Sequence, residues 1–267
     1  MASAPVPRAR SFLAERLAAA DMVDDALDSP RADSVSLAAA DRRGVFVVLE
    51  GGEGAGKTTQ WSRLADALRA VGHDVVAVRE PGGTPAGDAI RALLLDPASQ
   101  LAAESEALLF AASRAQLVRD VIAPAVQRGA VVMVDRFLLS TYAYQGAGRG
   151  LPMSSLRAVN HFATGGLAPD LTLLLSLPLA EAQARMHARG AADRMEREDL
   201  AFHERVREAF DRAVSAEWQA QHPEVGPVVA VPAEGAADAV TGRCLEALVA
   251  RWPERFAAAA TAALGAL

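Results

Sequence analysis

The most regular feature of the sequence is a set of five short apolar runs. They occupy residues 45–49, 74–78, 131–135, 171–175 and 227–231. Hydrophobic residues follow one another within each run, without the alternation expected of a strand that has one solvated face, so both faces are predicted to be covered. Helical patterns occupy residues 86–95 and 104–127, and apolar residues recur at helical spacing after residue 200. The pattern predicts an α/β fold, with a five-stranded parallel sheet and helices on both of its faces.

A glycine-rich segment follows the first apolar run. The residues Gly51, Gly52, Glu53, Gly54, Ala55, Gly56, Lys57 and Thr58 spell G-x-x-x-x-G-K-T, and Thr59 opens a stretch compatible with a helix. In such a P-loop the backbone N–H groups point into one concavity, and the helix adds the positive end of its dipole. We expect Lys57 to bridge the β- and γ-phosphates of a nucleotide and the Thr58 hydroxyl to contact Mg²⁺. The alternative, a glycine-rich turn with an incidental lysine, is disfavoured by the strand before it and the helix after it.

Two more segments are predicted to lie beside this loop, because ligands of parallel sheets bind at the carboxyl ends of the strands. The second run is followed by residues 79–84 (REPGGT), and the third ends at Asp135, which precedes Arg136. We expect Asp135 to hold Mg²⁺, with capping of the next helix as the alternative. Arg136 is expected to donate two hydrogen bonds to a phosphate, with an exposed, solvated arginine as the alternative.

Composition and charge exclude several classes of protein. The chain has 267 residues, a net charge of -6 and a single cysteine, Cys244. An acidic chain is unsuited to binding an extended nucleic-acid backbone, and one cysteine excludes internal disulfides and thiolate metal clusters. No apolar run reaches the roughly 18 to 20 residues that span a bilayer, and residues 1–20 lack a signal-peptide core. We therefore expect no membrane partner, no nucleic-acid partner and a cytoplasmic location.

The chain is predicted to form one domain, residues 44–252, with an extension at each end. Residues 1–43 are rich in Ala, Arg and Asp and contain no strand-like run. Disorder or a loosely docked helix is the expectation for them. A partner-binding or targeting role and a misassigned start are the alternatives, and the acidic residues of this segment disfavour organelle targeting. Residues 253–267 form an Ala-rich tail, expected to be helical or frayed and without an assigned function.

Four segments together make the chain resemble the thymidylate kinase (dTMP kinase) family. They are residues 50–59, residues 79–84, the run Phe110-Ala111-Ala112-Ser113-Arg114, and Asp135-Arg136 with residues 140–146. Their order and spacing are those of the family from about residue 45 to residue 231. The resemblance implies a P-loop NTPase fold with a mobile lid, Mg²⁺ as cofactor, and transfer of the ATP γ-phosphoryl group to dTMP, giving dTDP and ADP in dTTP synthesis.

The resemblance also implies roles for particular residues. The dTMP site would comprise Arg91, Phe110, Arg114, Arg136, Ser140, Thr141, Tyr144 and Gln145. Phe110 would stack on thymine and Arg114 would bind a carbonyl oxygen of the base, although Phe110 by itself is more simply explained as core. Tyr144 would lie beneath the sugar and disfavour a ribose 2′-hydroxyl. Glu53 matches an acidic position that faces the sugar and phosphate of the acceptor.

One catalytic arginine is predicted to come from the lid. The variable positions of the P-loop, residues 52–55, carry no positive charge. Residues 185–196 resemble the lid of bacterial relatives that supply the arginine there, with Gly190 as a hinge. We expect Arg189 to close over the ATP phosphates, with Arg194 as the second candidate. A solvated charged loop is the alternative.

Other functions are weaker fits. The alternative of a P-loop kinase for another nucleoside monophosphate or for a nucleoside does not explain the presence of Phe110, Arg114, Tyr144 and Gln145. A GTPase is disfavoured because no Asn-Lys-x-Asp segment occurs. A regulatory nucleotide-binding module without catalysis is a minority alternative, given intact Lys57 and Asp135. The family resemblance implies a homodimer, for which residues 104–127 offer a face, although packing within the monomer explains these residues equally well.

Overall fold

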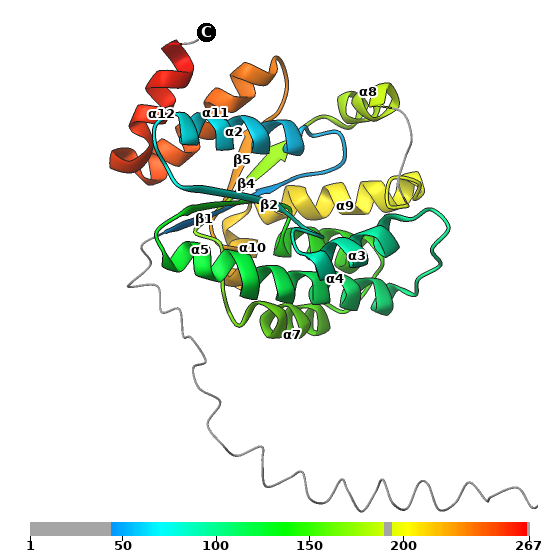
Figure 1. Cartoon of the computed structure of the whole chain (residues 1–267). Coiled ribbons are helices and arrows are strands. Elements are labelled where there is room, and N and C mark those ends of the chain that lie inside the picture. The colour runs from blue at the N-terminus through cyan, green and yellow to red at the C-terminus, as the bar shows by residue number, and fades with distance from the viewer. Residues whose placement is uncertain (1–43, 190–193, 266–267) are drawn as a thin grey trace, which may run out of the picture. The chain divides into compact units, whose positions relative to one another are not determined.

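The computed structural model describes residues 44–189 and 194–265. Its centre is a five-stranded sheet in the order β2-β3-β1-β4-β5, in which every neighbouring pair is parallel (Figure 1). The strands are β1 (Val45–Glu50), β2 (Val75–Arg79), β3 (Val131–Asp135), β4 (Leu171–Ser176) and β5 (Val228–Pro232). The five strands predicted from the apolar runs are confirmed, with bounds that differ by one residue at most.

Two hydrophobic cores lie on opposite faces of the sheet, because successive side chains of a strand point to opposite faces. Val45, Val47 and Leu49 of β1 belong to one core, whereas Phe46 and Val48 belong to the other. Every residue of β1 and β3 is buried, as the continuous apolar pattern predicts. The edge strands β2 and β5 are only partly covered, so for them the expectation of two covered faces was wrong.

Helices cover both faces of the sheet (Figure 1). One face is covered by α2 (Lys57–Ala70), α11 (Ala237–Arg251) and α12 (Pro253–Gly265). The other face is covered by α4 (Ala103–Leu117), the π-helix η2 (Val118–Ile122), α5 (Ala123–Gln127), α6 (Leu138–Thr141), the π-helix η3 (Tyr142–Gly148), α7 (Met153–Thr164) and α9 (Leu200–Ala213). The remaining elements are α3 (Pro85–Leu95), α8 (Leu179–Arg189), α10 (Ala216–Gln221) and the 3₁₀-helix η4 (Pro223–Val225).

The long helix expected over residues 104–127 is present but interrupted. It is divided into α4, η2 and α5, and Pro124 lies in the first turn of α5. Pro124 has no N–H for the carbonyl four residues earlier, and its ring crowds that carbonyl. The wider π turn of η2 accommodates this conflict without ending the helix.

The C-terminal segment packs on the domain. Phe256 and Ala259 of α12 are buried in the same core as α2 and α11. The first turns of α12 therefore belong to the folded domain, and the helical form expected of the tail is found over Pro253–Gly265. The expected N-terminal extension, residues 1–43, lies outside the described residues.

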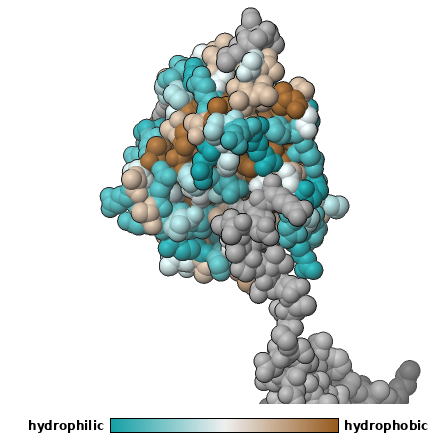
Figure 2. All heavy atoms as spheres, turned by 90° about the vertical axis from the view of Figure 1, so that its left-hand side faces the viewer, coloured by the Kyte–Doolittle hydropathy of each residue, from teal (hydrophilic) through white to brown (hydrophobic). Residues whose placement is uncertain are grey.

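The surface carries no membrane-spanning element in the part of the chain that the structure describes, where no helix is long and apolar enough to cross a bilayer. Figure 2 shows one face of the molecule, on which hydrophilic residues predominate and apolar residues occur in small groups.

Candidate active site

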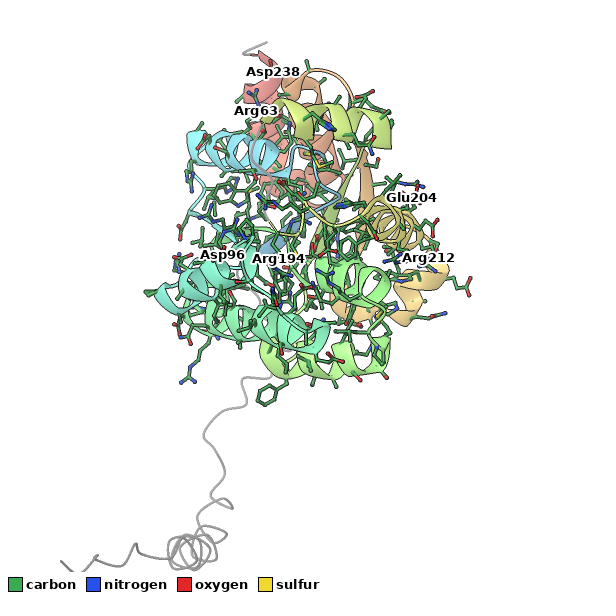
Figure 3. All side chains as sticks on the ribbon, turned by 90° about the vertical axis from the view of Figure 1, so that its right-hand side faces the viewer. Arg63, Asp96, Arg194, Glu204, Arg212 and Asp238 are labelled. Carbon is green, nitrogen blue, oxygen red and sulfur yellow. The ribbon has the colours of Figure 1, made fainter. Side chains whose placement is uncertain are left out.

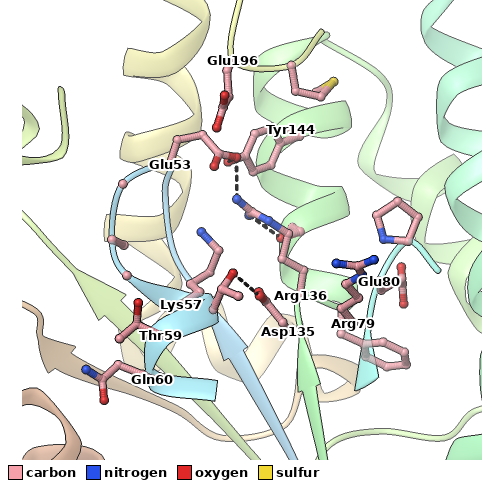
Figure 4. A pocket seen from close by; sticks show the side chains of 18 of the residues that line it. Glu53, Lys57, Thr59, Gln60, Arg79, Glu80, Asp135, Arg136, Tyr144 and Glu196 are labelled. Atoms are coloured by element: carbon pink, nitrogen blue, oxygen red, sulfur yellow. Dashed lines mark hydrogen bonds and ion pairs between the residues drawn. The ribbon is translucent and has the colours of Figure 1, made fainter. Parts of the chain in front are cut away.

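The carboxyl ends of three neighbouring strands meet at one edge of the sheet. Leu49 of β1 pairs with Asp135 of β3, which in turn pairs with Arg79 of β2. The loop after β1, the residues after Asp135 and the loop after Arg79 therefore start side by side. They enclose a cleft of about 690 Å³ (Figure 4).

The P-loop bends through glycines in the left-handed region. Gly54 has φ +76° and Gly56 has φ +87°. A Cβ at Gly54 would approach the carbonyl oxygen of Ala182 in α8 to 2.4 Å, so this position also needs glycine for space. Helix α2 begins at Lys57, and its first turn has no acidic residue, so its unpaired N–H groups and dipole favour an anion in the cleft.

Lys57 is the only lysine of the chain and lines this cleft. Its Nζ donates to the carbonyl oxygen of Gly52 over 2.7 Å. Burial and the neighbouring guanidinium of Arg136 lower the pKa of Lys57 to about 8, against the opposing effect of Glu53 and Asp135. The amine is thus charged at neutral pH but loses its proton more readily than an exposed lysine.

We expect this shift to limit the pH range of ATP capture. Between pH 7 and pH 9 the charged fraction of a group with this pKa falls about tenfold, so kcat/KM for ATP should fall by that factor, because this ratio reports the free enzyme. The direct measurement is the acylation rate of Lys57 by an amine reagent between pH 6 and 11, with peptide mapping to separate it from the α-amino group. A midpoint near 8 agrees with the structure, and one near 10.5 contradicts it.

Thr58 and Asp135 form a pair at the bottom of the cleft. The Thr58 hydroxyl donates to Asp135 Oδ2 over 2.9 Å. The other carboxylate oxygen, Oδ1, is buried and has no hydrogen-bond partner within the described residues. A buried carboxylate oxygen without a donor is suited to a cation. The described residues contain no group of three or more His, Cys, Asp or Glu side chains that could hold a metal. An ion bound at Asp135 would therefore need further ligands from a substrate or from water.

Arg136 joins the P-loop to the opposite wall of the cleft. It is the one non-glycine residue with positive φ (+71°) in the described part of the chain. Its guanidinium donates to Glu53 over 2.5 Å, to the Gly51 carbonyl over 3.1 Å and to Ser140 Oγ over 3.1 Å (Figure 4). Burial opposes its charge, but Glu53 and Tyr144 raise the pKa of Arg136 above its usual range. The strained backbone holds a permanent positive charge inside the cleft.

Glu50 is a functional neighbour that the sequence did not reveal. It is fully buried at the end of β1, where its carboxylate accepts hydrogen bonds from the backbone N–H of Phe137, and from the N–H and hydroxyl of Ser140. These bonds fix the turn after Arg136. The available signal was an acidic residue that ends an otherwise apolar strand directly before the P-loop.

The far end of the cleft is aromatic and contains a buried ion pair. Arg114 is 1% exposed and forms a bidentate pair with Glu80. It also donates to Thr141 Oγ1 over 2.9 Å and to the Asn160 side chain. Burial raises the pKa of Glu80 to about 7, while Arg114 acts in the opposite direction. The half-buried ring of Phe110, one turn before Arg114 on α4, lines the same space.

Comparison with known proteins shows which family the chain is similar to. The family model described as thymidylate kinase matches residues 49–222. The thymidylate kinase of Deinococcus radiodurans is 52% identical over 177 residues, which cover 66% of this chain and 86% of that protein. The chain belongs to the thymidylate kinase family.

Two further relatives extend the match. The thymidylate kinase of a Synechococcus strain is 47% identical over 211 residues, covering 78% of this chain and 96% of that protein. A crystal structure of thymidylate kinase from Ehrlichia chaffeensis has a TM-score of 0.59 and 29% identity, and the match covers 77% of this chain and 98% of that chain. The resemblance and the P-loop NTPase-like fold inferred from the sequence are confirmed.

Most of the predicted site residues of this thymidylate kinase family member line one cleft. The residues of the predicted acceptor site that line it are Arg91, Phe110, Arg114, Arg136, Ser140, Thr141, Tyr144 and Gln145. From the P-loop side it is lined by Glu53, Gly54, Ala55, Gly56, Lys57, Thr58 and Thr59, together with Asp135. Gly51 and Gly52 contribute through their carbonyl groups, which accept from Arg136 and Lys57 respectively.

The predicted lid gives a different result for each of its arginines. Helix α8 ends at Arg189, whose side chain lies outside the described residues, as do residues 190–193. Arg194, the second candidate for the phosphates, lies elsewhere: its guanidinium is 2.7 Å from Glu106 and donates to the Leu94 carbonyl over 2.7 Å (Figure 3). It does not line the cleft, because the buried carboxylate of Glu106 holds it on the acceptor side.

Arg185 was not assigned a role from the sequence, yet it lines the cleft. Its guanidinium donates to the Ala233 carbonyl over 3.1 Å, and it is the nearest atom group, at 3.8 Å, to a Cβ built on Gly56. Arg185 precedes Arg189 by four positions in the sequence, and this spacing was the available signal. Ala233, Gly235, Ala237 and Val240 complete this end of the cleft.

Proposed function

We propose that this chain transfers the γ-phosphoryl group of ATP to dTMP. A phosphate oxygen of dTMP forms a bond to the γ-phosphorus as the bond from that phosphorus to the β-bridging oxygen breaks, which gives dTDP and ADP. One observation carries the proposal beyond family membership: a single cleft is lined at one end by the P-loop and at the other by all the residues predicted to bind dTMP.

The chemistry fits the charges of the cleft. The attacking oxygen is already anionic, so no general base is required, whereas two polyanions must be brought together and the charge on the transferred group must be stabilised. Lys57 and Arg136 supply buried positive charge between the two ends of the cleft. Glu53 holds Arg136 in place and accepts from the Tyr144 hydroxyl over 2.8 Å, which positions both beside the acceptor.

Mg²⁺ is the proposed cofactor, and Asp135 and Thr58 are the residues that would hold it. The partnerless Oδ1 of Asp135 and the adjacent hydroxyl of Thr58 are hard oxygen donors, which this ion prefers. When bound, the ion would neutralise charge on the phosphates of ATP. The fold places these two oxygens, from Asp135 and Thr58, next to Lys57.

The two nucleosides are assigned to opposite ends of the cleft. We assign the nucleoside of ATP to the end formed by Arg185 and residues 233–240, because this end adjoins the start of α2. The acceptor base is assigned to Phe110 and Arg114, with Tyr144 beneath the sugar, where its ring stacks 5.0 Å from the Arg136 guanidinium. Arg189 remains the proposed source of the arginine that closes over the phosphates.

The acceptor panel tests this proposal. ADP release from ATP and Mg²⁺ should be measured with dTMP, dUMP, dCMP and AMP in turn. We expect dTMP to give the highest kcat/KM. Faster turnover of AMP or dCMP would remove the thymine assignment while retaining the phosphate site, and binding of ATP and dTMP without turnover with any acceptor would favour a regulatory module.

Truncation of Phe110 should affect the acceptor alone. In Phe110→Ala we expect KM for dTMP to rise by about 10- to 100-fold, since base stacking on an aromatic ring contributes about 1–3 kcal/mol, while KM for ATP stays within about twofold. Steady-state kinetics with either substrate varied gives both values. The matched control is Phe162→Ala, the same change at a ring that is 89% exposed on α7. An unchanged KM for dTMP in Phe110→Ala would place the base elsewhere.

A homodimer is the proposed assembly, with α4 in its interface. Leu108 on α4 is 58% exposed, and Leu93 on the adjoining α3 is 46% exposed, so apolar surface is available there. Sedimentation equilibrium of the wild type and of Leu108→Glu tests this assembly: a dimer that dissociates in the variant agrees with it, and a monomeric wild type contradicts it. The cytoplasmic location stays a prediction.

A further inference from the structure

The strongest feature outside the phosphate site is a buried carboxylate beside the base end of the cleft. Glu106 of α4 is fully buried. It accepts from Gln145 Nε2 over 2.9 Å and from two nitrogens of Arg149 over 3.0 and 3.2 Å, and it lies 2.7 Å from the Arg194 guanidinium. Glu106 itself does not line the cleft, whereas Gln145 does.

The ionised state of Glu106 is enforced by its neighbours. Burial opposes the charge, but hydrogen bonds from Arg149, Gln145 and Arg194 hold the pKa of Glu106 below its usual value. Arg149 is fixed in turn by Glu198 over 2.6 Å and by stacking on Phe202 at 4.8 Å. A carboxylate in this setting carries no proton and can only accept hydrogen bonds.

This restricts the amide of Gln145 to one orientation. A side-chain amide has a donating nitrogen and an accepting oxygen, and only the nitrogen can face an ionised carboxylate without repulsion. With Nε2 committed to Glu106, the oxygen Oε1 is the group left for a ligand. A base that presents an N–H group at its Watson–Crick edge is complementary to Oε1, and a base that presents a ring nitrogen lone pair there is not.

Thymine and uracil carry a hydrogen on N3, and cytosine carries a lone pair on N3. We propose that Glu106 is a positioning residue that, through Gln145, makes the acceptor site select pyrimidines with an N3–H group and reject cytosine. This inference rests on the proposed function, because it assumes that the acceptor base lies beside Gln145. The Phe110 ring, one turn along α4 from Glu106, supplies the stacking surface for any pyrimidine and cannot make this distinction.

The test is the ratio of kcat/KM for dTMP to that for dCMP in Glu106→Gln. The new amide can donate to Gln145 Oε1, so the Gln145 amide is free to rotate and present Nε2 to the cleft. We expect the ratio to fall by about 10-fold or more, as for loss of one buried hydrogen bond and relief of one repulsion, while KM for ATP stays within about twofold. A purely structural role would lower kcat/KM for both acceptors equally and leave the ratio unchanged, which would overturn the inference.

Three comparisons sharpen the result. Gln145→Leu, which removes the amide, should lower the ratio as much as Glu106→Gln does, and the double variant should lower it no further, because the two residues act through one contact. An unchanged ratio in Gln145→Leu would overturn the inference even if Glu106→Gln does not fold.

The control is Glu224→Gln, which alters a carboxylate bound to Tyr142 and Arg157 away from the cleft and should leave the ratio unchanged. If the wild type does not phosphorylate dTMP, the proposed function is wrong. If the wild type phosphorylates dTMP and the dTMP-to-dCMP ratio is unchanged in both Glu106→Gln and Gln145→Leu, only this inference is wrong.

Discussion

Replacing Lys57 by alanine should lower kcat by about 10³-fold, a loss typical for one preorganised charged group that stabilises the transition state. Lys57 is buried at the start of α2, next to Arg136 and within the P-loop concavity, so no solvent ion can take its place. The measurement is the rate of ADP release at saturating ATP and dTMP. Because the chain has no other lysine, no neighbouring amine is available to compensate.

The control for this variant is Arg69→Ala, in the last turn of the same helix. The side chain of Arg69 is 48% exposed and pairs with Asp66 on α2, and neither residue lines the cleft. Exposed ion pairs contribute little to stability, so kcat and the midpoint of thermal unfolding should change only slightly. A Lys57→Ala variant that folds normally and retains more than about a tenth of wild-type kcat would contradict the role assigned to Lys57.

The second large effect is expected at Arg189. Arg189→Ala should lower kcat by about 10³-fold and leave the dissociation constant of dTMP nearly unchanged, because a catalytic arginine contributes mainly in the transition state. The reason lies in the P-loop: residues 52–55 carry no positive charge, so the arginine must come from another segment. Single-turnover kinetics with calorimetric binding of dTMP separates the two quantities.

Two variants provide the comparison for Arg189. Arg185→Ala, one turn earlier on α8, removes a guanidinium that the structure places against Ala233, so we expect mainly a higher KM for ATP. Arg212→Ala removes an exposed arginine of α9 and should have no effect on either constant. If Arg189→Ala turns over at the wild-type rate while Arg185→Ala does not, the catalytic arginine is Arg185 and the assignment from the sequence is wrong.

Most strands of the sheet could be predicted because each strand is recognised from its own short stretch of sequence. Each buried strand is a continuous apolar run, and the G-x-x-x-x-G-K-T pattern fixes which strand carries the phosphate loop. The strand order could not be derived in the same way, since pairing of β1 with both β3 and β4 depends on contacts between residues more than 80 positions apart. The partial exposure of β2 and β5 follows from that order, because both are edge strands.

The site was predicted where chemistry is encoded in a motif and missed where it depends on a distant partner. Arg194 illustrates this difference: its position in a basic stretch near Arg189 suggested a phosphate contact, but the buried carboxylate of Glu106, on a helix about 90 residues earlier, determines where it lies. Glu50 and Glu106 were missed for the same reason, as nothing in the neighbouring sequence shows which donors they meet. Arg136 was predicted as a phosphate ligand, but its left-handed backbone could not be anticipated for a non-glycine residue.

The most direct test of the account follows the phosphorus atom itself. ATP labelled in its γ-phosphoryl group should be incubated with Mg²⁺, dTMP and the wild-type protein, and the labelled products separated. The account predicts that the label appears in dTDP in an amount equal to the ADP formed, and that this transfer is lost in Lys57→Ala. Label recovered only as inorganic phosphate, or in no product at all, would contradict the claim that this cleft joins ATP to dTMP.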